Sequence, residues 1–276
     1  MKEKVSLYEV LVKTSYSTLI TEPKDKNLTN PVGFGSGFIV EYENHILFVT
    51  ADHTVHIDDY NEGFEQRTWK DYKISVINNN SDPYNFLSTG IEQLNGFYSM
   101  EEFNLEKPDD MPKLVDVSVC LMIDDNLKLP FLTKEVKFQN GEIIKAGEHK
   151  FQIKKECFSE AKTNINYFIF GKIRTRLIDN IRIESEHTLK ESLKFICRSG
   201  DYLLFNTPNL IHDKEDWVGL SGSPVISEEG DCVGVLCSVR ENSRSIWVMP
   251  ISKVKMLIEV AICQEKIKDN QKNIHI

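Results

Sequence analysis

The sequence predicts an all-β barrel or sandwich that ends in one helix, and three observations lead to this fold class. Short runs of β-branched and aromatic residues recur along the 276 residues, separated by Gly, Asn, Asp and Pro, which is typical of all-β proteins. Helical spacing of apolar residues is rare until the C-terminal end. The shares of hydrophobic (41%) and charged (27%) residues are near the average for soluble globular proteins, so they suggest neither a disordered nor a membrane class.

Two hairpins are predicted from their turns. Residues 37–49 contain two apolar runs separated by Glu-Asn at 43–44, and residues 223–239 contain two more, separated by Glu-Gly-Asp at 229–231. Such runs with a short turn between them indicate antiparallel strands. The stretch from 53 to 114 mixes short apolar runs with long polar loops, so we expect insertions there.

The chain is long enough for two subdomains of similar size. Residues 126–145 are polar and contain turn residues, so they are the best candidate for a linker. We therefore predict one domain over residues 1–135 and another over 136–276. The second ends in an amphipathic helix at about 252–266 that is expected to cover the second barrel; its stripe comprises Ile251, Val254, Leu257, Ile258, Ala261 and Ile262.

Charge and hydropathy limit the partners and the cellular location expected for this protein. The net charge is −9, from 33 basic and 42 acidic side chains, which argues against nucleic acid as a partner. Residues 1–30 contain no apolar segment of signal-peptide length, and no later run approaches the about 20 apolar residues of a membrane span. The expected location is the cytoplasm, with no membrane partner.

The six cysteines predict neither a zinc site nor a redox site, because none forms a CxxC pair. Buried free thiols are the simpler interpretation. Cys232 and Cys237 lie at odd spacing on one predicted strand, so their side chains are expected on opposite faces.

The most specific motif is GLSGSPV at residues 219–225. A serine between two glycines and ahead of a proline is typical of a nucleophile on a tight turn that can bind an oxyanion. The α/β-hydrolase elbow instead requires a glycine two residues after the serine, where this chain has Ser223, and a histidine after it. Since only His275 follows Ser221, the esterase interpretation loses both its motif and its base.

A second motif lies far upstream, GSGFIV at residues 35–40 followed by LFVTADH at 47–53. The two motifs, in this order, resemble those of trypsin-like serine proteases, and the resemblance covers about residues 32–260. It implies two six-stranded antiparallel β-barrels of the chymotrypsin type, with the active site in the cleft between them.

The resemblance also assigns a catalytic triad. Ser221 is the nucleophile, His53 is the general base and then acid, and Asp116, in VDVSVCL at 115–121, orients the imidazole. The backbone N–H groups of Gly219 and Ser221 form the oxyanion hole. The histidines that do not follow such a motif are His45, His56, His149, His187 and His212. Asp52 adjoins His53 but is expected to point away from it. The other acids not chosen for the role of Asp116 are Asp109, Asp110, Asp124 and Asp125.

The chain departs from secreted members of this family at Leu220, where they carry the aspartate that pairs with a newly cleaved N-terminus. It looks closer to bacterial or intracellular members, including glutamyl endopeptidases with the GxSGSP pattern. The substrate pocket is expected around Glu215, Cys237 and Val239. An acid at position 215 favours Arg or Lys before the scissile bond, although the same acid also fits a solvated loop, and Val239 replaces the usual glycine and narrows the pocket.

The sequence therefore predicts a serine endopeptidase that cleaves protein or peptide substrates through an acyl-enzyme, without metal or cofactor. Two alternatives stay open. One is an enzyme that is latent until an activating protein partner or ligand orders the serine loop, and the other is a catalytically silent protein-binding module on the same fold.

Overall fold

The computed structural model describes residues 5–61, 64–68, 70, 72–77, 91–107, 110–122, 132, 135–179 and 182–274. Several sequence predictions fall outside these residues: the polar loop at 78–83, part of the linker at 126–145, and the side chains of Asp109, Asp124 and Asp125. The domain boundary near residue 135 stays a prediction.

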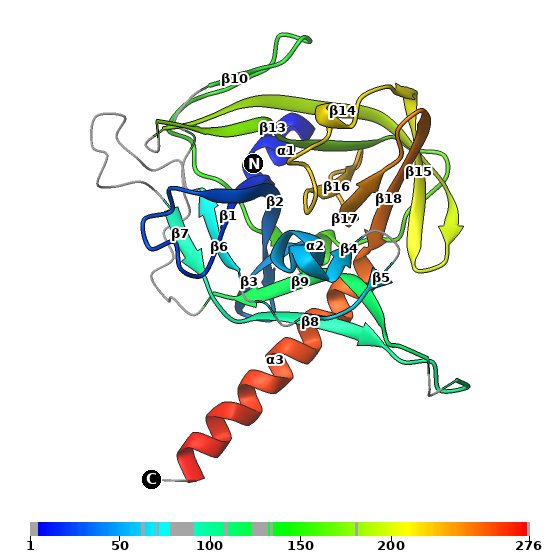
Figure 1. The fold of residues 1–276 in the computed structure, drawn as a ribbon. Helices are drawn as coiled ribbons and strands as arrows, with labels where there is room; N and C mark the ends of the chain where they lie inside the picture. Colours follow the sequence, from blue (N-terminus) through cyan, green and yellow to red (C-terminus); the bar gives the residue numbers. More distant parts are fainter. Residues whose placement is uncertain are drawn as a thin grey trace.

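The first half of the chain forms an open sheet (Figure 1) in the strand order β7-β6-β1-β2-β3-β9-β8, with β12 added beside β2. The six-stranded barrel expected here is not confirmed. The end strands β7 and β8 are consecutive in the chain but are not paired with each other, and the turn between them contains Gly96 at φ +76°. The strands are β1 (Tyr16–Thr21), β2 (Pro31–Tyr42), β3 (His45–Thr50), β6 (Lys73–Ile77), β7 (Ile91–Leu94), β8 (Phe97–Glu102), β9 (Lys113–Leu121) and β12 (Ile153–Lys154).

The second half closes into a barrel of six strands in the order β13-β14-β15-β18-β17-β16, as the sequence predicted. Figure 1 shows this barrel above the open sheet. Its strands are β13 (Tyr167–Ile178), β14 (Arg182–Ser199), β15 (Tyr202–Ile211), β16 (Pro224–Ser227), β17 (Cys232–Val239) and β18 (Ser243–Pro250).

Both predicted hairpins are confirmed. β2 pairs with β3 from Phe38–Val49 to Tyr42–His45, and the turn residues Glu43 and Asn44 have φ of +48° and +65°, as a tight two-residue hairpin turn requires. β16 pairs with β17 through the turn that contains Gly230. The remaining short elements are α1 (Leu7–Thr14), α2 (Asp52–Val55), η1 (Ile57–Asp59), β4 (Tyr60–Asn61), β5 (Phe64–Glu65), β10 (Val136–Lys137), β11 (Ile143–Ile144), η2 (Lys155–Cys157) and η3 (Lys214–Asp216).

The C-terminal helix α3 (Ile251–Ile274) is longer than the predicted helix and joins both halves. It packs against β17 and β18 of the barrel, as expected, and also against β8 and β9 of the open sheet, which the sequence did not indicate. Its predicted apolar stripe is buried in the largest core cluster, together with Val117 and Val119 of β9 and Val235 of β17. Beyond this stripe the helix extends away from the body (Figure 1).

All six cysteines are free thiols. Cys232 and Cys237 belong to the same core cluster, contrary to the expectation of opposite faces. The register of β17 against β16 skips Val233, because Val225 pairs with Gly234 and Ile226 with Cys232. This bulge inserts one residue and brings both thiols to one side of the strand. Among the described residues, none of the helices has the length and apolar character needed to cross a membrane.

Candidate active site

His53 and Asp116 are brought together by the pairing of β3 with β9. Thr50 at the end of β3 is the partner of Ser118, so α2, which follows directly, lies beside Asp116. Nδ1 of His53 is 2.9 Å from each oxygen of the Asp116 carboxylate, and the His53 backbone N–H donates to Oδ1 at 2.9 Å. The carboxyl side chain is 7% exposed and the imidazole 28%. With Nδ1–H held by the acid, Nε2 is the nitrogen left to accept a proton.

The electrostatic surroundings favour the charged form of the His53 ring. Burial works against an imidazolium, but the charge of Asp116, its hydrogen bond and the charge of Asp52 together raise the pKa of His53 above its ordinary value. The edge of the Tyr60 ring packs near the imidazole, with the two centroids 6.0 Å apart at 73°. The ring is therefore fixed in position and disposed to take up a proton.

Asp52, the residue before His53, carries the second buried carboxylate, whose hydrogen-bond donors do not include His53. Its side chain is fully buried, and its oxygens accept hydrogen bonds from His56 Nδ1, Tyr60 Oη, Arg67 Nη1, Ser99 Oγ and Ser118 Oγ. Burial opposes its charge, but the hydrogen bond and charge of His56 and the charge of Arg67 outweigh this and lower the pKa of Asp52. Asp52 is thus ionised and saturated with donors.

Arg67 is the cation that pairs with Asp52, and no sequence pattern indicated it. Its side chain is 6% exposed, and Nη1 is 2.8 Å from both Asp52 and Asp59, while Nε is 3.3 Å from Glu101. Arg67 ties the segment after α2 to the helix that carries His53 and to β8. An arginine in a polar loop shows no spacing that could have indicated this role.

The serine loop is held by Ser36, which belongs to the upstream GSG motif. Its Oγ donates to the carbonyl oxygen of Gly219 at 2.6 Å, and its backbone N–H donates to the carbonyl oxygen of Ser221 at 2.8 Å. Leu220 between them is fully buried in the core of the barrel, in one cluster with Trp217. The loop is therefore ordered by hydrogen bonds from the other half of the chain and by an apolar anchor, in place of an ion pair.

Two positions in this loop require glycine. Gly219 has φ +99°, and a Cβ there would stand 2.7 Å from the carbonyl oxygen of Lys172. Gly222 has φ +91°, and its Cβ would overlap the carbonyl oxygen of Ser36 and Oγ1 of Thr50. The left-handed conformation excludes most side chains, and close packing excludes even a methyl group.

The backbone N–H groups of Gly219 and Ser221 have no acceptor among the described residues, whereas the neighbouring N–H groups of Leu220 and Gly222 donate to Trp217 and Leu236. The Ser221 hydroxyl donates to the carbonyl oxygen of Cys237 at 3.5 Å. Within the described part of the chain no hydrogen bond joins it to His53.

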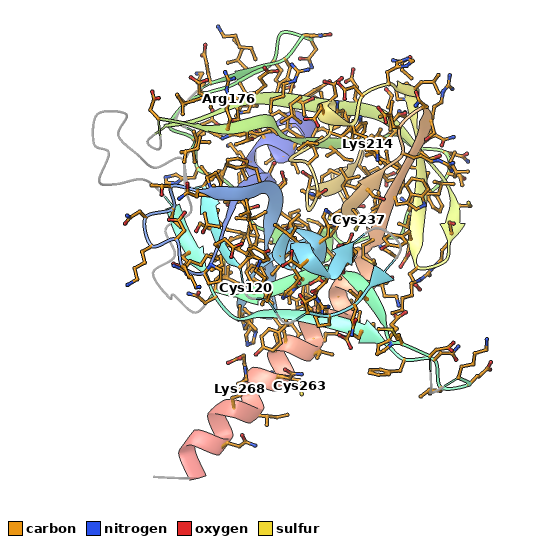
Figure 2. All side chains as sticks on the ribbon, in the orientation of Figure 1. Cys120, Arg176, Lys214, Cys237, Cys263 and Lys268 are labelled. Atoms are coloured by element: carbon orange, nitrogen blue, oxygen red, sulfur yellow. The ribbon has the colours of Figure 1, made fainter. Side chains whose placement is uncertain are left out.

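The three residues expected around the substrate pocket lie in different environments. Cys237 is buried and central in the molecule (Figure 2), and its thiol donates to the backbone carbonyl of Asp116 at 3.3 Å. Burial, together with the charge of Asp116, raises the pKa of this thiol. Glu215 is exposed on η3, and Val239 is half-buried at the end of β17. A cavity between β14 and β15 reaches Asp216 and Trp217, which follow Glu215 in the chain, but Glu215, Cys237 and Val239 do not line it.

In the described part of the chain no group of three His, Cys, Asp or Glu side chains could hold a metal ion. The groups found at the predicted positions are the His53 imidazole paired with the Asp116 carboxylate, the Ser221 hydroxyl, and the backbone N–H groups of Gly219 and Ser221, which have no acceptor among the described residues. These are the groups that acyl transfer by a serine requires.

No protein-family model matches the chain, and none of the curated proteins does. Solved structures are similar at low identity. The Rv3671c protease of M. tuberculosis in its active form is 12% identical, with a TM-score of 0.45 and coverage of 92% of this chain and 83% of that one. The serine endoprotease of Yersinia pestis is 12% identical, with a TM-score of 0.46 and coverage of 94% and 67%. Human heparin binding protein is 9% identical, with a TM-score of 0.47 and coverage of 88% and 89%.

Proposed function

We propose that this chain is a serine endopeptidase with Ser221 as nucleophile, His53 as base and Asp116 as the orienting acid. The observation that carries the proposal is the His53–Asp116 pair, in which both carboxylate oxygens lie 2.9 Å from Nδ1. Cys237 connects this pair to the serine. Its thiol donates to the backbone carbonyl of Asp116, and its own carbonyl oxygen lies 3.5 Å from Oγ of Ser221.

The proposed reaction begins when Oγ of Ser221 turns toward His53. Nε2 takes the hydroxyl proton as Oγ attacks the carbonyl carbon of the scissile peptide, and the negative charge on the substrate oxygen is met by the N–H groups of Gly219 and Ser221. Asp116 stabilises the imidazolium. The tetrahedral intermediate then expels the amine, which receives the proton from His53, and water enters by the same route to release the acyl group.

The substrates proposed are proteins or peptides. Glu215, Cys237 and Val239 remain the proposed pocket residues, with the acid of Glu215 favouring a basic residue before the scissile bond. Kinship with bacterial GxSGSP enzymes and a cytoplasmic location belong to the same proposal, as does a reaction that uses no cofactor.

One observation favours the latent form of the enzyme as the second candidate. The Ser221 hydroxyl lies 3.5 Å from the carbonyl oxygen of Cys237 and has no hydrogen bond to His53 among the described residues, so it must turn before it can reach the base. A partner or ligand that biases the loop would promote that rotation. A silent binding module would show no such activation, which separates it from a latent enzyme.

The experiment is labelling with a fluorophosphonate probe at neutral pH, read as a mass increase of the intact protein, with Ser221→Ala and Ser223→Ala as a matched pair. We expect the wild type to be labelled and Ser221→Ala to be unlabelled. The buried Ser223 serves as the control serine, so Ser223→Ala should be labelled like the wild type. Labelling that survives in Ser221→Ala would disprove the assignment of the nucleophile.

A further inference from the structure

The barrel has a gap where β14 and β15 separate. The two strands are paired from Lys194–Asn206 to Ser199–Tyr202. Before this, Leu189, Lys190 and Leu193 of β14 pair only on their other side, with β13, while Glu191 and Ser192 lie in a bulge of that pairing. On the side of β15 that faces β14, pairing ends at Asn206, so residues 207–210 have no partner there. The strand β18, on the opposite side, also skips these residues, because its register passes from Asn206 to Ile211. Two strand segments therefore lack a ladder partner on the sides that adjoin the gap, which is the situation that β-strand addition exploits.

A cavity of about 420 Å³ lies between these two segments. Its size is within the range of ligand sites, roughly 300–1,000 Å³. The lining combines apolar side chains from both strands with the ring of Trp217, and its main apolar members are Leu189, Leu193, Pro208, Leu210, Ile211 and Trp217. The cavity can therefore take an apolar side chain whose backbone runs along the strand edges.

Lys190 supplies the polar recognition group of this cavity. Its Nζ lies 4.6 Å from the centroid of the Trp217 ring, and within the described residues its ammonium has no hydrogen-bond acceptor. Burial lowers the pKa of Lys190, and the nearby charge of Asp216 only partly offsets this. A half-buried ammonium without an acceptor is a binding site for a carboxylate oxygen.

Three acids also line this cavity, Glu191, Asp213 and Asp216; Glu191 is exposed to solvent, and the other two accept hydrogen bonds. Asp216 bonds Arg174 at 2.8 Å, and Asp213 accepts the backbone N–H of Glu215 at 2.9 Å. Because these acids are already bonded or solvated, they attract a cation in the ligand less strongly than free buried carboxylates would. The Lys190 ammonium, in contrast, has no acceptor among the described residues. The unused donor at Lys190, and not the overall charge of the lining, therefore favours a carboxylate in the ligand.

We propose that this gap, the β14–β15 gap, binds an extended peptide segment of a partner protein. The segment pairs its backbone with the open edge of β14 or β15, places an Asp or Glu carboxylate on Lys190, and inserts a neighbouring apolar side chain against Trp217. This function goes beyond the proposed proteolysis, because it requires none of the triad residues.

The site also has a route to the serine loop. The carbonyl of Trp217 accepts the N–H of Leu220 at 3.0 Å, and both side chains pack in one cluster. A peptide that holds Trp217 in place will stabilise the loop between Gly219 and Ser221. This coupling, unlike the binding itself, rests on the proposed function.

The test begins with a displayed library of random heptapeptides selected on the Ser221→Ala protein, which cannot cleave them. Enriched peptides should carry Asp or Glu beside an apolar residue. Fluorescence anisotropy of a labelled synthetic peptide then gives Kd for Ser221→Ala and for the same protein with Lys190→Met. We expect at least a tenfold weakening with Lys190→Met, partial recovery with Lys190→Arg, and no change with Lys194→Met, which removes an exposed lysine of the same strand.

A change in the peptide completes a double-mutant cycle with Lys190→Met. Replacing its acid by Gln should weaken binding to the parent protein but add no further loss on Lys190→Met, as a direct pair requires. Equal Kd values for the parent and Lys190→Met, or a library without enrichment of acids, would overturn the proposal. The proposal would also fail if a single glutamate with blocked ends bound as tightly as the peptide, because the strand edges would then be unused. It would fail as well if the enriched sequences matched this chain, because the gap would then bind a second copy of the protein.

A final measurement separates this proposal from the proposed function. The rate of fluorophosphonate labelling of the wild-type protein is compared with and without saturating peptide, and coupling predicts a faster rate with peptide. If binding is present but Ser221 is never labelled, the peptide site stands and the protease assignment is wrong.

Discussion

Two buried carboxylates, Asp52 and Asp116, act on His53, and their surroundings differ. Asp52 receives hydrogen bonds from five side chains and is fully buried. The Asp116 carboxylate is bonded by the ring and the N–H of His53, and that ring is 28% exposed. A charge saturated by fixed donors holds structure in place, whereas a charge paired with one accessible imidazole can respond when that imidazole takes up a proton.

The largest effect expected from this comparison is on chemistry, through Asp116→Asn. The amide keeps the shape of the side chain but no longer stabilises the imidazolium or fixes the same tautomer, so we expect the rate of fluorophosphonate labelling to fall by about 10⁴-fold. Circular dichroism should show an unchanged fold. A rate within tenfold of the wild type would show that Asp116 is no more than a structural acid.

The second effect is on stability, through Arg67→Met. Removing this cation leaves the buried carboxylates of Asp52 and Asp59 without their shared partner. Breaking a buried pair in this way costs about 3–5 kcal/mol, which thermal unfolding should register as a large drop in Tm. Lys70→Met is the matched control, because the Lys70 ion pairs with Glu22 and Asp58 lie at the exposed surface. A Tm of Arg67→Met equal to that of the control would contradict a structural role for the cluster.

This contrast also shows which parts of the site could be predicted. The apolar runs around His53 and Asp116 indicated two strands, and the pairing of β3 with β9 brings His53, which follows β3, beside Asp116 within β9. The bond from Ser36 to Gly219 spans 183 residues, and no local pattern encodes a contact of that range. Arg67 lies in a loop without periodicity, so its partners depend wholly on tertiary packing.

Bulges and turns explain where the fold predicted from the sequence differs from the structure. The rule of alternating faces placed Cys232 and Cys237 apart, but one extra residue at Val233 reverses that outcome. A bulge leaves no clear mark in an apolar run of β-branched residues. Likewise, the turn at Gly96 could join paired strands or part them, and only the packed structure decides that the first sheet stays open.

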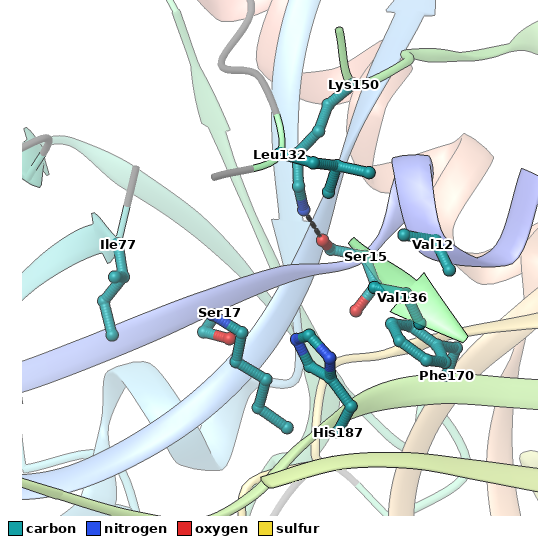
Figure 3. A pocket seen from close by; sticks show the side chains of 10 residues that line it. Val12, Ser15, Ser17, Ile77, Leu132, Val136, Lys150, Phe170 and His187 are labelled. Atoms are coloured by element: carbon teal, nitrogen blue, oxygen red, sulfur yellow. Dashed lines mark hydrogen bonds between the residues drawn. The ribbon is translucent and has the colours of Figure 1, made fainter. Parts of the chain in front are cut away.

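Lys150 extends the comparison to a buried charge without any carboxylate partner among the described residues. Its ammonium donates to the carbonyl oxygen of Ser15 (Figure 3) and lies 4.2 Å from the centroid of the Tyr16 ring. Burial, with the charge of Lys172, lowers the pKa of Lys150 to about 7. Below that pH the folded protein must hold a charge that the unfolded chain solvates freely, so this group destabilises the fold most at acidic and neutral pH.

We therefore expect Lys150→Met to stabilise the protein, by about 1–3 kcal/mol at pH 6. The unfolded lysine keeps its proton up to its ordinary pKa of 10.5, so the penalty in the wild type shrinks as the pH rises from 7 toward that value. Chemical denaturation at pH 6 and pH 9.5 measures the difference. A gain that is equal at both pH values would mean that packing, and not the charge, is the cause.

The smallest effect sharpens the first comparison, because both acids act on the pKa of His53 but to different degrees. Asp116 contributes its charge and a hydrogen bond, whereas Asp52 contributes charge alone and shares it with Arg67. A raised pKa means that the imidazole stays protonated, and unable to act as a base, up to a higher pH. The labelling rate should therefore rise with pH through a midpoint above the ordinary value of 6.5.

NMR titration of the His53 ring can rank the two contributions even where labelling is too slow to follow. Asp116→Asn should move the midpoint to lower pH by the larger amount, and Asp52→Asn should move it in the same direction by less. Because Asp52→Asn leaves Arg67 without one of its acids, the double variant Asp52→Asn/Arg67→Gln is needed to show that the shift comes from charge and not from local unfolding. Equal shifts for the two single variants would mean that the acid saturated with donors influences the base as strongly as the acid that touches it, and the distinction between them would fail.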